Sequence, residues 1–314
     1  MGTFNYAQHM ETMLPWPREQ AISATDEQQL HLPASNICLD FHGDPLRAEL
    51  AVFSDGNHHM ALRATAELFV QKYPEVTDVF YATTPPNMLV SALKTGAVNV
   101  GNLRLSRQPD LFISPLPVME QLRGNGFVDD CRPFMQSRCN VLLIRKHNPK
   151  SIAGIADLLR DDVRLFLSNP QNETASYLVY YQTMVGLLRE HGIDPQALDN
   201  KIASPAPAMI FGDRIHHREA PQALFDNKAD VAMVYYHLAL RYTRIFPDDF
   251  DFIPLGGTRS APQPGAANVT TVFYAGTVNQ GGRWGERFMD FLDSDEVTEI
   301  YASHGLSRAA ANLT

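Results

Sequence analysis

The sequence predicts an α/β fold in which helices cover mostly parallel sheets. From residue 48 to residue 123, short apolar runs of β-prone residues alternate with helix-like runs, as in a βαβαβ arrangement. Residues 163–237 repeat this order, with a loop rich in Asn, Ser and Thr before a long helix. These two observations predict two lobes of similar design.

The composition is that of a globular protein, because 45% of the 314 residues are hydrophobic and 19% are charged. The net charge of −9 and the lack of a dense Lys/Arg run argue against a nucleic-acid partner. No apolar run approaches the roughly 18 residues that a membrane span needs. Residues 1–20 have neither the basic start nor the apolar stretch of a secretory signal. We read residues 1–45 as an irregular N-terminal arm.

The segment Leu50–Leu62 is the first expected strand, loop and helix. A strand at 49–53 turns at Ser54-Asp55-Gly56-Asn57 and enters a helix at 58–73. Ser, Asp and Asn cap helices, and the free N–H groups at a helix start attract anions. The segment therefore predicts either a simply capped turn or an anion site.

The remaining elements follow the same pattern along the chain. Strands are expected at 76–82, 110–115, 140–145, 163–167, 230–235, 252–255 and 269–275. Helices are expected at 88–95, 116–123, 155–159, 175–191, 218–227, 285–291 and 295–304. Ligands of parallel sheets bind at the carboxyl ends of the strands. Four short polar residues fall at such ends: Ser54, Thr83, Thr84 and Ser114.

Five segments in this order resemble the type II periplasmic solute-binding proteins, most closely the molybdate/tungstate-binding proteins of ABC importers. They are the loop segments Leu50–Asn57 and Phe80–Asn87, the P-D-x-F-x-S segment Pro109–Ser114, the run Arg218–Tyr235 that contains A-D-x-x-x-V-Y, and the ending Phe288–Leu306. The resemblance covers about residues 48 to 308.

The resemblance implies two lobes joined by crossover strands, which close on a ligand by hinge motion. We expect lobe I at 46–128 plus 241–314 and lobe II at 129–240. The implied function is non-enzymatic capture of a small inorganic ligand, foremost a tetrahedral oxyanion, for an ABC permease. We expect a monomer without a cofactor other than the bound oxyanion or metal ion itself. The resemblance implies a periplasmic or extracellular location, whereas the absence of a visible signal leaves the cytoplasm open.

Loop hydroxyls, backbone N–H groups and one tyrosine would bind the oxyanion. The expected ligand-binding residues are Ser54, Asn57, His58, Thr83, Thr84, Ser114, Glu173, Ser176 and Tyr235. The V-Y signature favours Tyr235 as a ligand hydroxyl, and a buried strand tyrosine is the equally weighted alternative.

The first loop departs from the family pattern because it holds Asp55, His58 and His59. An acidic residue would repel an oxyanion unless it points away or caps the helix. A divalent metal site formed by His58, His59, Glu173 and His237 is therefore the second hypothesis. The side chains of adjacent histidines on a helix point in different directions, so His58 and His59 together offer at most one metal ligand.

An enzyme on the same fold is the alternative from another class. Asp55, His58 and Glu173 could supply an acid/base pair for it. The cysteines show no metal-binding C-x-x-C spacing. Cys131 and Cys139 are expected to be buried free thiols, with a disulfide between them as the alternative.

Overall fold

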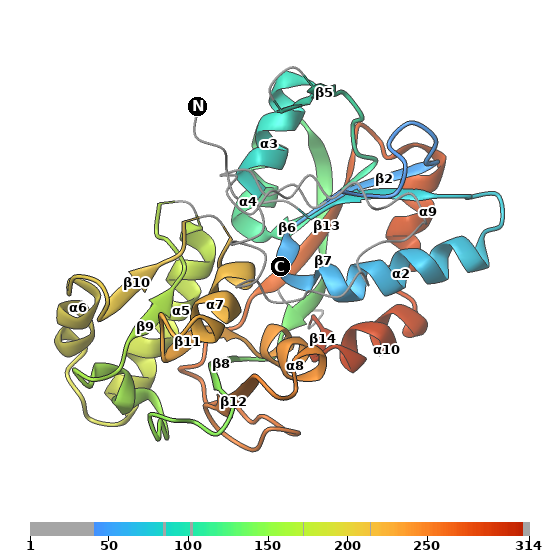
Figure 1. Ribbon diagram of the computed structural model, residues 1–314. Coiled ribbons are helices and arrows are strands. Elements are labelled where there is room, and N and C mark those ends of the chain that lie inside the picture. The colour runs from blue at the N-terminus through green and yellow to red at the C-terminus, as the bar shows by residue number, and fades with distance from the viewer. Residues whose placement is uncertain (1–40, 84–85, 101–102, 172, 214, 310–314) are drawn as a thin grey trace, which may run out of the picture. The chain divides into compact units, whose positions relative to one another are not determined.

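The computed structural model describes residues 41–309 except 84, 85, 101, 102, 172 and 214 (Figure 1). The expected arm at 1–45 thus lies almost wholly outside the described residues. The described chain forms two compact units, a first unit of 41–137 and 271–309 and a second unit of 138–270. Both units combine sheets with helices, which confirms the α/β prediction. No helix among the described residues has the length and apolar character to cross a membrane.

The first unit contains a seven-stranded mixed sheet. In spatial order its strands are β1 (Phe41–His42), β3 (Val79–Ala82), β2 (Leu50–Ser54), β6 (Leu111–Pro115), β13 (Val272–Val278), β7 (Val128–Ser137) and β14 (Leu306–Arg308). Only β3, β2 and β6 are mutually parallel, and the other neighbours pair antiparallel. The sheet is therefore mixed, whereas the sequence analysis expected a mostly parallel one.

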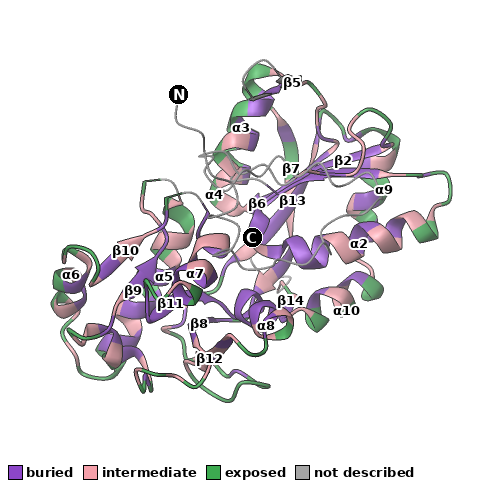
Figure 2. Ribbon diagram, viewed as in Figure 1, coloured by how far each residue is buried: buried purple, intermediate pink, exposed green. Residues whose placement is uncertain are grey.

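Helices cover both faces of this sheet. Side-chain alternation along β2 sends Leu50 and Val52 to one face and Ala51 and Phe53 to the other, and all four are buried. Figure 2 shows the central strands of this sheet coloured as buried. The first face packs against α2 (His59–Lys72), α9 (Gly282–Phe291) and α10 (Asp295–Ser303), and the second against α3 (Pro86–Thr95) and α4 (Leu116–Gly124). The short helix η1 (Gly56–His58) precedes α2, and β4 (Val98–Val100) pairs with β5 (Leu103–Leu105).

The second unit contains a five-stranded mixed sheet. Its order is β10 (Met209–Phe211), β9 (Leu165–Leu167), β11 (Val231–Tyr235), β8 (Asn140–Arg145) and β12 (Phe250–Pro254). Strands β10, β9 and β11 are parallel, and β8 pairs antiparallel with both β11 and β12. The helical elements are η2 (Ile155–Leu159), α5 (Thr174–Glu190), α6 (Gln196–Ile202), α7 (His216–Phe225) and α8 (Tyr236–Ile245). Strand β8 has the predicted bounds, and α8 begins at once after β11, where the sequence analysis placed only a strand end.

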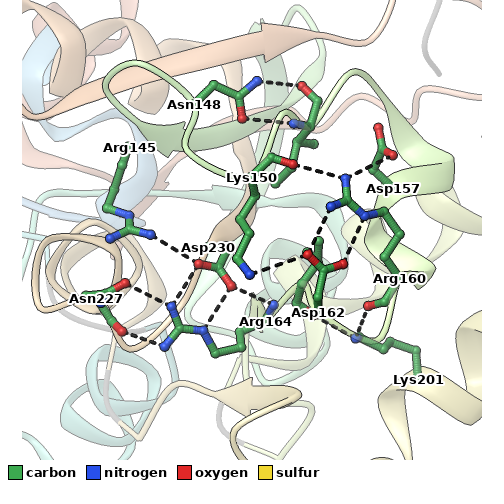
Figure 3. A network of polar contacts seen from close by, with 12 residues as sticks. Arg145, Asn148, Lys150, Asp157, Arg160, Asp162, Arg164, Lys201, Asn227 and Asp230 are labelled. Atoms are coloured by element: carbon green, nitrogen blue, oxygen red, sulfur yellow. Dashed lines mark hydrogen bonds and ion pairs between the residues drawn. The ribbon is translucent and has the colours of Figure 1, made fainter.

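A buried carboxylate, that of Asp230, fastens the start of β11 (Figure 3). Arg164 donates from Nε to Oδ2 at 2.9 Å and from Nη2 to Oδ1 at 2.8 Å, and Arg145 Nη2 adds a bond of 3.1 Å to Oδ1. Burial alone would raise the pKa of Asp230, but the hydrogen bonds from Arg164 hold that pKa below its usual value. The Asp of the A-D-x-x-x-V-Y signature thus anchors the sheet.

The chain passes from the first unit to the second after Ser137 and returns after Thr270. The sequence predicts these boundaries at 128/129 and 240/241. Strand β7 pairs with β13 and β14 and so stays with the first unit. Strand β12 pairs with β8 and keeps residues 241–254 in the second. Cys131 and Cys139 are free thiols.

Candidate functional site

Three hydroxyl residues lie side by side where the parallel strands of the first unit end. Ser54 is the last residue of β2 and pairs in register with Ile113, which precedes Ser114 in β6. Thr83 follows Ala82, the residue of β3 that pairs with Phe53. We call Thr83, Ser54 and Ser114 the hydroxyl edge. The fourth expected hydroxyl residue, Thr84, lies outside the described residues.

Two members of the hydroxyl edge keep unused hydrogen-bonding capacity. Thr83 and Ser114 are fully buried, yet neither Thr83 Oγ1 nor Ser114 Oγ has a hydrogen-bond partner among the described residues. An unsatisfied buried hydroxyl typically costs about 1–3 kcal/mol, so such groups point to a ligand or ordered water. The two hydroxyls are therefore available donors at the expected end of the sheet.

The third member, Ser54, is held by two neighbours. Its Oγ donates to the Asp55 carbonyl oxygen at 3.1 Å and lies 3.0 Å from His58 Nε2. His58 Nδ1 lies 2.9 Å from the hydroxyl of Tyr301 on α10. His58 is fully buried, and its ring packs against Phe273 with a centroid distance of 4.7 Å. The sequence predicts His58 as a direct ligand; its ring is buried in the core of the first unit, and a ligand role stays a prediction.

The acidic residue of the first loop acts as a cap. Asp55 Oδ1 accepts a hydrogen bond of 2.7 Å from the Asn57 N–H at the start of η1. Burial raises the pKa of Asp55 to about 6. His59 Nδ1 donates to the Gly56 carbonyl oxygen at 2.7 Å. Asp55 and His59 thus shape the loop itself.

In the second unit, the expected ligand Glu173 is bound to a helix start. Its Oε2 accepts a hydrogen bond of 2.8 Å from the backbone N–H of His216, the first residue of α7. A carboxylate at a helix N-terminus is stabilised by the helix dipole. Ser176 is half-buried in the first turns of α5. For both residues, a role in ligand binding stays a prediction.

Tyr235 ends β11 and is almost fully buried. Its ring packs against Tyr180 at 5.1 Å and stacks on His237 at 5.3 Å between centroids. The buried-tyrosine alternative describes this environment, and a role of the Tyr235 hydroxyl in binding stays a prediction.

Within the described residues, no group of three or more His, Cys, Asp or Glu side chains converges, so the metal site of the second hypothesis stays a prediction. His58 and His59 belong to the first unit, whereas Glu173 and His237 belong to the second. Of the acid/base groups expected for an enzyme, Asp55 and Glu173 each accept a hydrogen bond at a helix start, and His58 contacts Ser54 and Tyr301.

Two residues of interest were missing from the predicted site. Ser168 directly follows β9 and is fully buried, and its Oγ has no partner within the described residues. It repeats the strand-end pattern of Ser54 and Thr83, so the sequence carried a signal for it. Tyr301 gave no such signal, because it contacts His58 across 243 positions of the chain.

Several solved structures share this fold. Peb3 from Campylobacter jejuni matches with a TM-score of 0.59 and 15% identity, over 83% of this chain and 100% of that chain. The sulfate-binding protein SubI from Mycobacterium tuberculosis matches with a TM-score of 0.61 and 15% identity, over 83% and 87%. The periplasmic molybdate-binding protein of Azotobacter vinelandii matches with a TM-score of 0.54 and 15% identity, over 84% and 100%. Identities this low establish the fold alone.

No curated protein matches the sequence. A family model described as bacterial extracellular solute-binding protein, however, matches residues 50–307, which is most of the chain. This match agrees with the two-unit α/β fold and with hydroxyl donors at the ends of parallel strands. The chain belongs to the family of bacterial extracellular solute-binding proteins.

Proposed function

We propose that this solute-binding protein captures a tetrahedral oxyanion of the molybdate or tungstate class at the hydroxyl edge and supplies it to an ABC-type permease. The observation that carries the proposal is the pair of buried hydroxyls, Thr83 Oγ1 and Ser114 Oγ, that have no partner in the part of the chain that the structure describes. They flank Ser54 on adjacent parallel strands. Neutral O–H donors in a dry site bind an oxyanion through hydrogen bonds alone.

The chemistry of the edge favours an anion over a cation. Zinc, copper and similar ions are bound by several carboxylate, imidazole or thiolate ligands. The described residues offer no such group, and the carboxylate of Asp55 is occupied by the cap at η1. Two of the similar structures are described as sulfate-binding and molybdate-binding, which supports the same ligand class.

Thermal unfolding of dialysed protein against molybdate, tungstate, sulfate, phosphate, zinc and iron(III) tests the proposal. At about 1,000-fold excess over Kd, a ligand should add about 4 kcal/mol to the free energy of unfolding, a clear rise in Tm. We expect a rise with molybdate and tungstate. Stabilisation by zinc or iron alone would contradict the proposal.

Variants of the hydroxyl edge locate the binding event. Thr83→Val and Ser114→Ala remove one hydroxyl each, and we expect each to raise Kd by about tenfold, the loss of one hydrogen bond to a charged group. Thr65→Val is the matched control, because Thr65 is equally buried in α2 but donates to the Ala61 carbonyl oxygen at 2.8 Å. Equal effects of Thr83→Val and Thr65→Val on Kd would argue against ligand binding at the hydroxyl edge. Ser168→Ala, measured in the same titration, tests the corresponding strand end of the second unit.

A further inference from the structure

Three buried side chains of the first unit form a continuous hydrogen-bonded chain that ends at the hydroxyl edge. Tyr301 on α10, His58 at the end of η1 and Ser54 at the end of β2 are linked by contacts of 2.9 Å and 3.0 Å. All three side chains are fully buried. The His58 ring is enclosed by aromatic rings, including those of Phe273 and Phe134. Packing therefore fixes the imidazole plane in this orientation.

The acceptor at the far end of the chain sets the direction of every hydrogen bond. The Asp55 carbonyl oxygen can only accept, so Ser54 gives its single O–H to that oxygen. His58 Nε2 must then donate to Ser54 Oγ, which makes Nδ1 the accepting nitrogen of a neutral imidazole. Tyr301 accordingly donates its O–H to Nδ1. Burial raises the pKa of Tyr301 above its ordinary value, which keeps this hydroxyl protonated.

We propose that Tyr301 and His58 are positioning residues that hold the Ser54 hydroxyl as a hydrogen-bond donor for the bound oxyanion. The inference deepens the proposed function and rests on it. On binding, the Ser54 O–H turns from the Asp55 carbonyl oxygen to a ligand oxygen, while Nε2–H continues to donate to Oγ. No proton changes its atom in this step.

The relay makes Ser54 a better anion donor than an isolated serine. A hydroxyl that accepts a hydrogen bond is polarised and donates more strongly, because hydrogen bonds in a chain reinforce one another in a low-dielectric interior. The N–H of His58 also occupies one lone pair of Oγ, so the hydroxyl hydrogen is the group left for a ligand. Such a donor suits an oxygen atom with free lone pairs, as in an oxyanion.

A double-mutant cycle on molybdate binding separates a relay from a general packing role. Tyr301→Phe removes the hydroxyl and keeps the ring that packs against Phe134 at 5.3 Å. We expect Tyr301→Phe to raise Kd by about three- to tenfold, Ser54→Ala to raise it at least as much, and the double variant to equal Ser54→Ala. Tyr73→Phe, a half-buried tyrosine on the same core face, is the control and should leave Kd unchanged.

An additive loss in the double variant would overturn the inference, since Tyr301 would then act without Ser54. If the wild-type protein binds none of molybdate, tungstate and sulfate, the proposed function itself fails. If the wild type binds an oxyanion but the losses of the two single variants are additive, the proposed function stands and only the role of Tyr301 and His58 is contradicted. The two failures are therefore distinguishable.

The histidine tautomer gives a readout that packing alone would not change. In ¹⁵N-labelled protein, the His58 resonances, assigned by their loss in His58→Gln, should show Nε2–H in the wild type and a mixture of tautomers in Tyr301→Phe. A wild-type Nδ1–H tautomer would contradict the derived direction. His58→Gln retains an amide N–H for Ser54, so it should keep more affinity for molybdate than His58→Leu. Equal affinities of these two variants would also count against the relay.

Discussion

Asp110 and Ala51 bind one another through two hydrogen bonds. The Asp110 backbone N–H donates to the Ala51 carbonyl oxygen at 2.8 Å, and Asp110 Oδ2 accepts from the Ala51 N–H, also at 2.8 Å. The pair ties the start of β6 to β2 and so fixes the register that brings Ser54 opposite Ile113. The Asp of the P-D-x-F segment thus determines where the hydroxyl edge lies.

Removing this carboxylate should loosen the centre of the first unit. Asp110→Ala leaves the buried Ala51 N–H without its acceptor, and we expect a loss of about 1–3 kcal/mol in the free energy of unfolding. Asp110→Asn keeps one acceptor oxygen and should lose less. Urea denaturation followed by circular dichroism measures both variants. Equal stability of Asp110→Ala and the wild type would show that the register does not depend on this pair.

The Arg164–Asp230 ion pair of the second unit should be far more sensitive to mutation than its exposed neighbour in Figure 3. The Asp230 side chain is fully buried, so Arg164→Ala leaves a poorly compensated charge and should cost about 3–5 kcal/mol. Arg160→Ala breaks the more exposed pair with Asp162 and is the matched control, with an expected loss of about 1 kcal/mol or less. Chemical denaturation of the two variants compares them directly. Similar losses would show that burial of Asp230 does not govern the second unit.

Local patterns predicted most elements, whereas the partners of buried side chains stayed beyond sequence reasoning. Strand β8 was predicted with its observed bounds because β-prone residues fill it and the turn at 146–149 ends it. Strand β14 is short and depends on pairing with β7, which no local pattern reveals. The strand-end hydroxyls were visible as a repeated pattern. That His58 faces Tyr301 follows only from the packing of α10, which is remote in sequence.

Asp55 should make the protein less stable as pH rises. Burial raises its pKa from 3.8, the ordinary value of the unfolded chain, to about 6 in the folded state, so between these pH values the folded protein binds more protons than the unfolded chain. The stabilisation is fully present below pH 3.8 and is lost as pH rises through 6. Between pH 5 and pH 7.5 the loss amounts to roughly 1.4 kcal/mol.

Asp55→Asn tests this dependence because asparagine also caps helices but does not ionise. We expect the variant to gain stability relative to the wild type between pH 5 and pH 7.5, as measured by urea denaturation at both values. A difference between the two proteins that stays constant with pH would show that the carboxyl group titrates normally.

His216 should have the opposite effect in the second unit. Burial lowers the pKa of His216 from 6.5 to about 3, so the unfolded chain binds more protons in that interval. The contribution is fully present above pH 6.5 and is lost as pH falls towards 3. At pH 5 the loss relative to pH 7.5 should be about 2 kcal/mol, and it depends only on the folded pKa lying below 5.

The variant His216→Phe keeps a ring against Phe166 and Tyr180 but cannot be protonated. When the pH falls from 7.5 to 5, the free energy of unfolding of the variant should decrease less than that of the wild type. If the free energies of unfolding of the wild type and of His216→Phe change equally between these pH values, the pKa of His216 is not lowered in the folded state.

Thr83→Val should separate stability from binding. Valine has nearly the shape of threonine, and the replaced Oγ1 is buried without a partner, so the unliganded variant should be as stable as the wild type or more stable, by about 1 kcal/mol. The same change removes a donor for the ligand, so molybdate should raise the Tm of the variant less than that of the wild type. Thr65→Val, which removes a satisfied hydroxyl, should lower Tm and leave the molybdate-induced rise intact. A lowered Tm of unliganded Thr83→Val together with an unchanged molybdate-induced rise would mean that Thr83 serves the packing of the first unit. A buried hydroxyl that awaits a ligand lowers the stability of the unliganded protein, whereas a hydroxyl that is hydrogen-bonded within the fold raises it.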